Sequence, residues 1–128
     1  MNTISSQIAE WTQRTNVDEL PTSVVEGAKL RAMDLAGVML ASKDLKIVEA
    51  ARRAWTAIDG GGSITRIGSK EPMALTTPAF LNGVQSSALE FDDTYLPTTM
   101  HATGLAVSVA YPESQQRKVS GKKLIEAV

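Results

Sequence analysis

The chain has 128 residues and a net charge of −1; 43% of its residues are apolar and 21% are charged. These proportions are typical of one globular domain and argue against a disordered or nucleic-acid-binding chain. The absence of cysteine excludes disulfides, a thiolate nucleophile and a zinc–thiolate site. Neither a secretory signal nor a membrane-length apolar run occurs, so we expect a cytoplasmic protein without membrane or nucleic-acid partners.

The N-terminal part predicts two helices. Residues 3–14 carry one apolar face at helical spacing, which we expect to pack on the rest of the domain. The members of this face are Ile4, Ile8 and Trp11. After Pro21, a capping box formed by Ser23 and Glu26 opens a helix that runs to about residue 41. Because most faces of this second helix are apolar, we expect it to be buried.

A third helix and a short extended segment come next. Apolar residues at helical spacing predict a helix over residues 44–58, which a run of glycines ends. Residues 63–68 alternate β-branched and other residues, which favours a brief extended piece. Thr77 as N-cap and Pro78 as first helical residue then predict a helix over residues 78–90.

The C-terminal part predicts interrupted helices. Residues 104–110 have helical character that we expect Pro112 to disrupt, and a polar tract follows. Residues 120–128 restart a helix that is too short to be stable unless it packs. Together the elements predict an all-α fold: an irregular bundle of five to six helices in a single domain over residues 1–128, with one short extended segment near 63–68.

The side chains with the most chemical character lie around the predicted loop over residues 92–102. They are Glu90, Asp92, Asp93, Thr94 and His101, the only histidine. Three interpretations are open at this point. The loop is structural, and these groups satisfy local backbone atoms. Alternatively, the carboxylates and the imidazole hold a divalent metal ion. In the third interpretation a carboxylate orients the imidazole for general acid–base catalysis.

The chain resembles the MmgE/PrpD family, which contains 2-methylcitrate dehydratase, cis-aconitate decarboxylase and iminodisuccinate epimerase. The resemblance rests on an ordered set of segments over almost the whole chain. They are LP at 20–21, MDLAGVMLAS at 33–42, GGGSITRIG at 60–68, AFLNG at 79–83, FDDT at 91–94, His101, and SGKKLIEAV at 120–128. The most specific part is AFLNG followed by FDDT and then a histidine.

The resemblance implies roles for the loop residues. His101, Glu90 and Thr94 match catalytic residues of the family's cleft, and Asp92 and Asp93 lie in the segment that lines it, where we expect them to bind substrate. The implied reaction moves a proton beside a carboxylate of a small di- or tricarboxylic acid, with loss of water or carbon dioxide. It requires no metal ion and no other cofactor. The chain would form part of the family's helical domain, with the lid domain absent.

The sequence also departs from the family pattern. Ser86 and Ser87 stand where a histidine is often found, Ala102 replaces the proline that commonly follows His101, and Pro112 interrupts a normally smooth helix. Family members are far longer, and their second catalytic histidine, lysine and tyrosine lie beyond the matched region. We therefore expect a lyase whose site is incomplete in this chain, so that the isolated chain is inactive.

The alternative is a non-catalytic helical fragment, or a subunit whose site is completed by a partner chain. In either case, the second and last predicted helices would expose apolar faces if the remaining half of the site is missing. We therefore expect a homo-oligomer or an association with a complementing chain.

Overall fold

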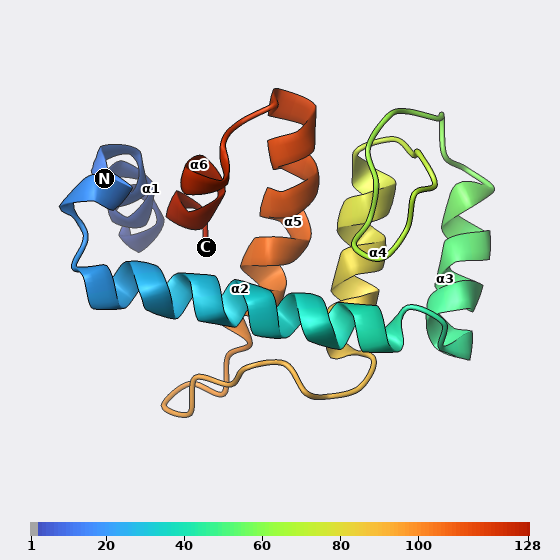
Figure 1. Cartoon of the computed structure of the whole chain (residues 1–128), viewed down its shortest axis with the longest axis horizontal. Coiled ribbons are helices and arrows are strands. Elements are labelled where there is room, and N and C mark those ends of the chain that lie inside the picture. Colours follow the sequence, from blue (N-terminus) through green and yellow to red (C-terminus); the bar gives the residue numbers. More distant parts are fainter. Residues whose placement is uncertain (1–2) are drawn as a thin grey trace.

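The computed structural model describes residues 3–128, which form six α-helices and no β-sheet (Figure 1). The helices are α1 (Ile4–Arg14), α2 (Thr22–Ser42), α3 (Lys46–Thr56), α4 (Thr76–Ser87), α5 (Ala102–Arg117) and α6 (Gly121–Glu126). A short 3₁₀ helix, η1 (Val17–Glu19), joins α1 to α2. The all-α bundle predicted from the sequence is confirmed. Within residues 3–128, none of the helices has the length and apolar character that a membrane crossing requires.

The long helix α2 organises the molecule, and α4 and α5 pack side by side against it (Figure 1). α3 lies on the other side of α4, and α6 lies beside α5 near the start of α2. Where these helices meet, a buried apolar cluster contains Leu35 and Met39 of α2, Val107 of α5, and Ile67 of the loop between α3 and α4. Leu35 and Met39 share a face because residues four apart lie one above the other on a helix.

The expectation that α2 is buried on most of its faces is wrong. Only Leu35, Met39 and Ser42 are buried in this helix, whereas Leu30 and Met33 are 60% and 67% exposed. Its packing partners among the described residues cover a single side of α2, which leaves the opposite apolar stripe in solvent. An apolar helix is buried only when enough neighbouring elements surround it.

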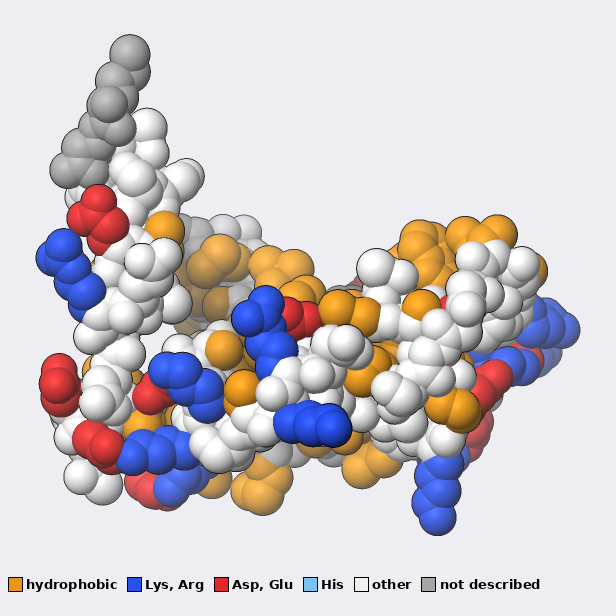
Figure 2. All heavy atoms as spheres, turned by 90° about the horizontal axis from the view of Figure 1, so that it is seen from above, with side chains coloured by type: hydrophobic (Ala, Val, Ile, Leu, Met, Phe, Trp, Pro, Cys, Tyr) orange, Lys and Arg blue, Asp and Glu red, His pale blue; other side chains and the backbone are white. Residues whose placement is uncertain are grey.

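The helix predicted near the N-terminus is confirmed as α1, but its predicted packing is wrong. The Thr3 side chain caps the helix by accepting the N–H of Ser6 at 3.1 Å. No residue of α1 is buried, and the apolar face formed by Ile4, Ile8 and Trp11 is more than half exposed. Figure 2 shows this helix standing out from the body of the molecule.

Two predicted helix caps are wrong. Pro21 caps α2 without a side-chain hydrogen bond, and Glu26 forms an ion pair with Lys29 at 2.7 Å instead of a capping box. At α4, the Thr77 hydroxyl bonds to Asp59 and does not act as N-cap, and the helix starts at Thr76, two residues before the predicted first residue Pro78. In both places a longer-range or alternative partner competes with the local cap.

The loop between α3 and α4 contains the predicted extended piece. Ile64 and Met73 exchange two backbone hydrogen bonds, at 3.1 and 2.8 Å, in an isolated antiparallel bridge. Gly62 is required beside this bridge, because a Cβ there would lie 2.3 Å from the Met73 carbonyl oxygen. The Thr77 hydroxyl and two loop N–H groups bond to the Asp59 carboxylate and lower its pKa. Asp59 therefore ties the start of this loop to its end and to the first turn of α4.

The prediction that Pro112 disrupts the helix is wrong, because α5 continues through it to Arg117. Pro112 is fully buried and lacks an N–H, which deprives the Ser108 carbonyl of its usual helical partner. The helix ends at Lys118, whose positive φ of 52° and backbone N–H close the last turn. Packing of α5 against α4 and α2 compensates for a proline cost of about 3 kcal/mol.

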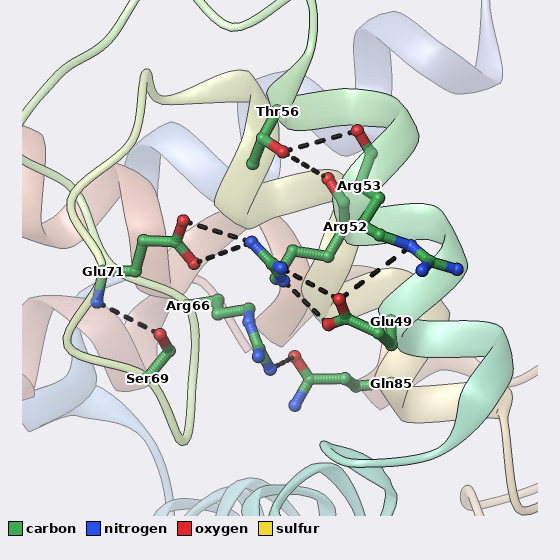
Figure 3. A network of polar contacts seen from close by, with 8 residues as sticks. All are labelled: Glu49, Arg52, Arg53, Thr56, Arg66, Ser69, Glu71 and Gln85. Atoms are coloured by element: carbon green, nitrogen blue, oxygen red, sulfur yellow. Dashed lines mark hydrogen bonds and ion pairs between the residues drawn. The ribbon is translucent and has the colours of Figure 1, made fainter.

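A polar network joins α3, α4 and the loop between them (Figure 3). Arg52 bonds to Glu49 at 2.8 Å and to Glu71 at 3.3 Å, and the hydrogen bond from Arg52 lowers the pKa of Glu49. Arg66 is buried nearby and donates to the side-chain oxygen of Gln85 at 2.6 Å. Burial lowers the pKa of Arg66 because its charge is removed from water.

Candidate active site

A tight turn between α4 and α5 brings the chemically active residues together. The Tyr95 N–H donates to the Met100 carbonyl oxygen at 2.8 Å and closes the turn over residues 96–99. Thr94 and His101 flank this bridge and therefore lie side by side. His101 also immediately precedes α5, so its backbone position is set by the start of that helix.

The His101 ring is held through one nitrogen. Its Nδ1 lies 3.0 Å from the Asp93 carbonyl oxygen, 3.4 Å from the Thr94 hydroxyl and 3.5 Å from Oδ2 of Asp92. A carbonyl oxygen can only accept a hydrogen bond, so Nδ1 carries the proton in this arrangement. The neutral ring then has its lone pair on Nε2, for which residues 3–128 provide no hydrogen-bond partner. This tautomer makes Nε2 the atom that can accept a proton.

Asp92 and Asp93 are adjacent but have different surroundings. The Asp92 side chain is only 7% exposed and accepts a hydrogen bond from the Ser87 hydroxyl at 3.3 Å. Asp93 accepts one from the Thr103 hydroxyl of α5 at 2.8 Å, while its other carboxylate oxygen is buried with no partner among the described residues. Asp92 therefore faces the imidazole, whereas the Asp93 side chain fastens the loop to α5 and only its backbone reaches the ring.

Glu90 lies apart from the other predicted site residues. It has a positive φ of 55°, and its N–H donates to the Ser87 carbonyl oxygen at 3.1 Å, which ends the turn after α4. Its side chain is exposed and forms no hydrogen bond or ion pair within residues 3–128. The role predicted for Glu90 stays a prediction.

A groove of about 560 Å³ runs between α4 and α5 and reaches the histidine. Its lining contains Asp92 and the half-exposed His101 but not Asp93, Thr94 or Glu90. The complete lining is Ala79, Phe80, Gly83, Val84, Ser86, Ser87, Asp92, His101, Gly104, Leu105, Ser108 and Val109. No lysine or arginine contributes to this groove, so the chain itself offers a carboxylate ligand no cationic partner there.

The sequence singled out Ser87 only as a departure from the family pattern, and it gave no role to Gly104 or Ser108 of this groove. Ser87 donates a hydrogen bond to Asp92, and Gly104 of α5 lies beside the same carboxylate, where a Cβ would make an ordinary contact of 3.6 Å with Oδ2. Ser108 lies one helical turn beyond Gly104 in the same groove. No local pattern identifies these residues, because the groove exists only where two helices far apart in sequence pack together.

The cluster is suited to moving a proton. Within residues 3–128, no three histidine, aspartate or glutamate side chains converge in a way that would hold a metal ion. The described geometry is an imidazole with one nitrogen fixed by hydrogen bonds, beside a nearly buried carboxylate. Such a pair can accept a proton at the free nitrogen and stabilise the imidazolium that results.

Comparison with protein families identifies the family of the chain. The model of the MmgE/PrpD N-terminal domain matches residues 6–128. No curated protein and no solved structure matched the chain. The family match includes α4, the turn that carries Asp92 and Asp93, and His101. The chain therefore belongs to the MmgE/PrpD family, matching its N-terminal domain.

Proposed function

We propose that this chain supplies one wall of the active site of a lyase that dehydrates or decarboxylates a small di- or tricarboxylic acid. The chemistry is general acid–base catalysis without a metal ion. The observation that carries the proposal is the His101 ring, fixed through Nδ1 and unpaired at Nε2, at a groove that Asp92 also lines. Membership of the MmgE/PrpD family supports a dehydratase-like reaction.

In this proposal, Nε2 of His101 removes a proton from the carbon next to a substrate carboxylate. For dehydration, the His101 imidazolium returns this proton to the hydroxyl on the neighbouring carbon, the hydroxyl leaves as water, and a carbon–carbon double bond forms. The Asp92 carboxylate, 3.5 Å from Nδ1, stabilises the imidazolium formed in between. The Thr94 hydroxyl helps to keep the ring in place from 3.4 Å.

The groove needs positive groups that these residues do not provide. No lysine or arginine occurs between Lys70 and Arg117, and none lines the groove. Substrate carboxylates and the enolate-like charge of the transition state require hydrogen-bond donors or cations. We therefore propose that a further polypeptide segment or a second chain completes the site. The exposed Glu90 carboxylate is available to bind a group from that half.

This function is tested by a variant of His101 that keeps a hydrogen-bond donor in place of Nδ1 but lacks Nε2, the proposed base. In His101→Asn, the side-chain amide can still donate to the Asp93 carbonyl oxygen, but no lone pair replaces Nε2. Turnover of a panel of di- and tricarboxylic acids by the completed protein should fall by about 10²–10⁴, the usual contribution of a general base. Lys29→Gln, a distant variant on the surface of α2, is the matched control and should retain full activity.

The isolated chain should show little or no turnover. Family-like rates from residues 1–128 alone would contradict the incomplete site, and rates that survive His101→Asn would contradict its role as base. The competing function is a non-catalytic helical module, favoured by the lack of any cation in the groove. Sequencing the DNA downstream of Val128 separates the two: an in-frame continuation or an adjacent reading frame with the missing half supports the enzyme.

A further inference from the structure

The groove between α4 and α5 is too apolar to be filled by a compact polycarboxylate alone. Away from Asp92 and His101, its walls are made largely of small or apolar residues, including Phe80, Leu105 and Val109. Leu105 and Val109 lie one helical turn apart on α5 and are largely exposed. Its volume of about 560 Å³ is typical of small-molecule sites, which combine apolar walls with few polar groups. A ligand held only at the histidine would leave this apolar wall in water.

Gly83 opens the α4 wall of the groove. It lies within the helix, where glycine is unfavourable compared with alanine. No close helix approach requires it, since a Cβ at this position would meet no atom within 4 Å. The absent side chain therefore leaves space in the groove itself, which Gly83 lines.

Ser108 provides unused hydrogen-bonding capacity in the opposite wall. The residue is 4% exposed, lines the groove, and its hydroxyl has no hydrogen-bond partner within residues 3–128. The proline four residues later also leaves the Ser108 carbonyl without its usual helical partner. Buried polar atoms are normally paired, so an unpaired hydroxyl in a groove wall points to a ligand atom.

We propose that this groove receives an aliphatic arm of the substrate, so that the acid is an alkyl-substituted di- or tricarboxylate whose arm is longer than a methyl group. The inference rests on the proposed function, because the carboxylate end is placed beside His101 and Asp92. The arm lies over the open space at Gly83 and against Leu105 and Val109, and a polar atom near its tip bonds to Ser108.

Binding of matched acids to the completed protein tests the arm directly, because the carboxylate head requires the positive groups that we propose for the other half of the site. Succinate, methylsuccinate and hexylsuccinate share one dicarboxylate head and differ only in the arm, and amide NMR titration reports where each binds. Hexylsuccinate should bind about tenfold more tightly than methylsuccinate, because burial of added methylenes is worth at least that factor. Its shifts should include the amides of Gly83, Leu105 and Ser108. Equal binding of the three acids, no binding of hexylsuccinate, or shifts confined to other surfaces would overturn the proposal.

Two glycine variants separate groove filling from general effects on helices. Gly83→Leu favours the helix and fills the open space, so hexylsuccinate affinity should fall about tenfold. Gly27→Leu makes the same change inside α2, away from the groove, where a Cβ meets only the end of the Arg31 side chain at 3.9 Å. It should leave binding unchanged. Unaltered hexylsuccinate binding in Gly83→Leu would overturn the proposed position of the arm.

Ser108→Ala tests the tip of the arm. It should weaken binding of an analogue whose arm ends in a hydroxyl and leave hexylsuccinate unaffected; equal effects on both ligands would contradict the contact. These readouts do not depend on turnover. If the protein binds acids with a long arm more tightly but never shows lyase activity, the proposed function is contradicted, whereas binding of the arm in the groove is supported. If it shows lyase activity but no preference for a long arm, only the proposal that the groove receives an arm is contradicted.

Discussion

Gln85 illustrates how a single polar residue can join three segments of this fold. It is completely buried in α4, and its side-chain nitrogen donates to the carbonyl oxygens of Met39 and Ile67 at 2.8 and 3.1 Å. Its side-chain oxygen accepts from Arg66 at 2.6 Å, and its backbone carbonyl accepts from the Ser42 hydroxyl at 2.7 Å. Every polar side-chain atom of Gln85 is therefore paired, which is the condition for a buried amide to stabilise a core.

Replacing the two partners of the buried Arg66–Gln85 bond should have unequal effects. Gln85→Ala leaves two backbone carbonyls and a buried guanidinium unpaired and opens a cavity, so unfolding free energy should fall by about 2–4 kcal/mol. Arg66→Met removes a desolvated charge but leaves the Gln85 side-chain oxygen unpaired, so the loss should be smaller, about 1–2 kcal/mol. Urea denaturation of both variants measures the difference, and a larger loss in Arg66→Met would contradict this account.

At the scale of the elements, α5 contains a proline, Pro112, which from the sequence alone predicts a break in the helix. Pro112→Ala restores the N–H that bonds the Ser108 carbonyl and removes a proline cost of about 3 kcal/mol, but it gives up buried ring contacts. The net effect expected is a stabilisation of about 1–2 kcal/mol. Thermal and urea unfolding measure it. A destabilised variant would mean that the Pro112 ring contributes more to packing than its missing hydrogen bond costs.

The attachment of α6 should depend on pH through Glu126. Its carboxylate forms an ion pair with Lys123 and accepts the N–H of Val17 in η1 at 3.2 Å, and these contacts lower its pKa below the ordinary 4.5. A carboxylate with a lowered folded-state pKa stabilises the fold above its unfolded pKa, and the stabilisation is lost as pH falls through the folded value.

Glu126→Gln removes the charge and keeps the shape of the side chain. The variant should be less stable than the parent at neutral pH, and the difference should shrink on acidification below the ordinary glutamate range. Unfolding measured at several pH values between neutral and acid provides the test, with Glu19→Gln, a charge removal in neighbouring η1 outside this ion pair, as control. Parallel pH profiles for the parent and Glu126→Gln would contradict the link.

At the scale of the whole molecule, one apolar surface of α2 has no packing partner among residues 3–128. On α2, Leu30, Met33 and Leu40 form an exposed apolar stripe opposite the buried Leu35 and Met39. Apolar side chains also gather on the face that Figure 2 displays. Monomeric proteins rarely expose contiguous apolar patches larger than a few hundred Å². The exposed stripe is therefore a candidate contact for a second copy or a complementing chain.

We expect the chain to self-associate and to bind a hydrophobic dye. Sedimentation velocity should show an increase of average mass with concentration, and Leu30→Glu combined with Met33→Glu should reduce both association and dye binding. Lys46→Gln with Arg53→Gln, at two exposed residues of α3, changes the net charge by the same amount away from the stripe and serves as the control. A monomer at all concentrations, with no dye-binding surface, would contradict the prediction.

The candidate site could be predicted only in part. The short spacing of Asp92, Asp93, Thr94 and His101 guaranteed that a tight turn could bring them together, and the Tyr95–Met100 hydrogen bond does so. Sequence spacing does not decide which carboxylate meets the ring, because adjacent residues in a turn point in different directions. Asp92 contacts His101, whereas Asp93 bonds to Thr103 and Glu90 points to no described partner.

By itself, the sequence determined that this protein is an all-α member of its family and where most helices lie, because periodicity and motifs are carried by neighbouring residues. Only the tertiary structure decided which side of α2 is covered, that α5 continues through Pro112, and that Gly83 opens into a groove. The reason is physical: burial, tolerance of a proline and the shape of a groove depend on what packs against each helix, and those partners are distant in the chain.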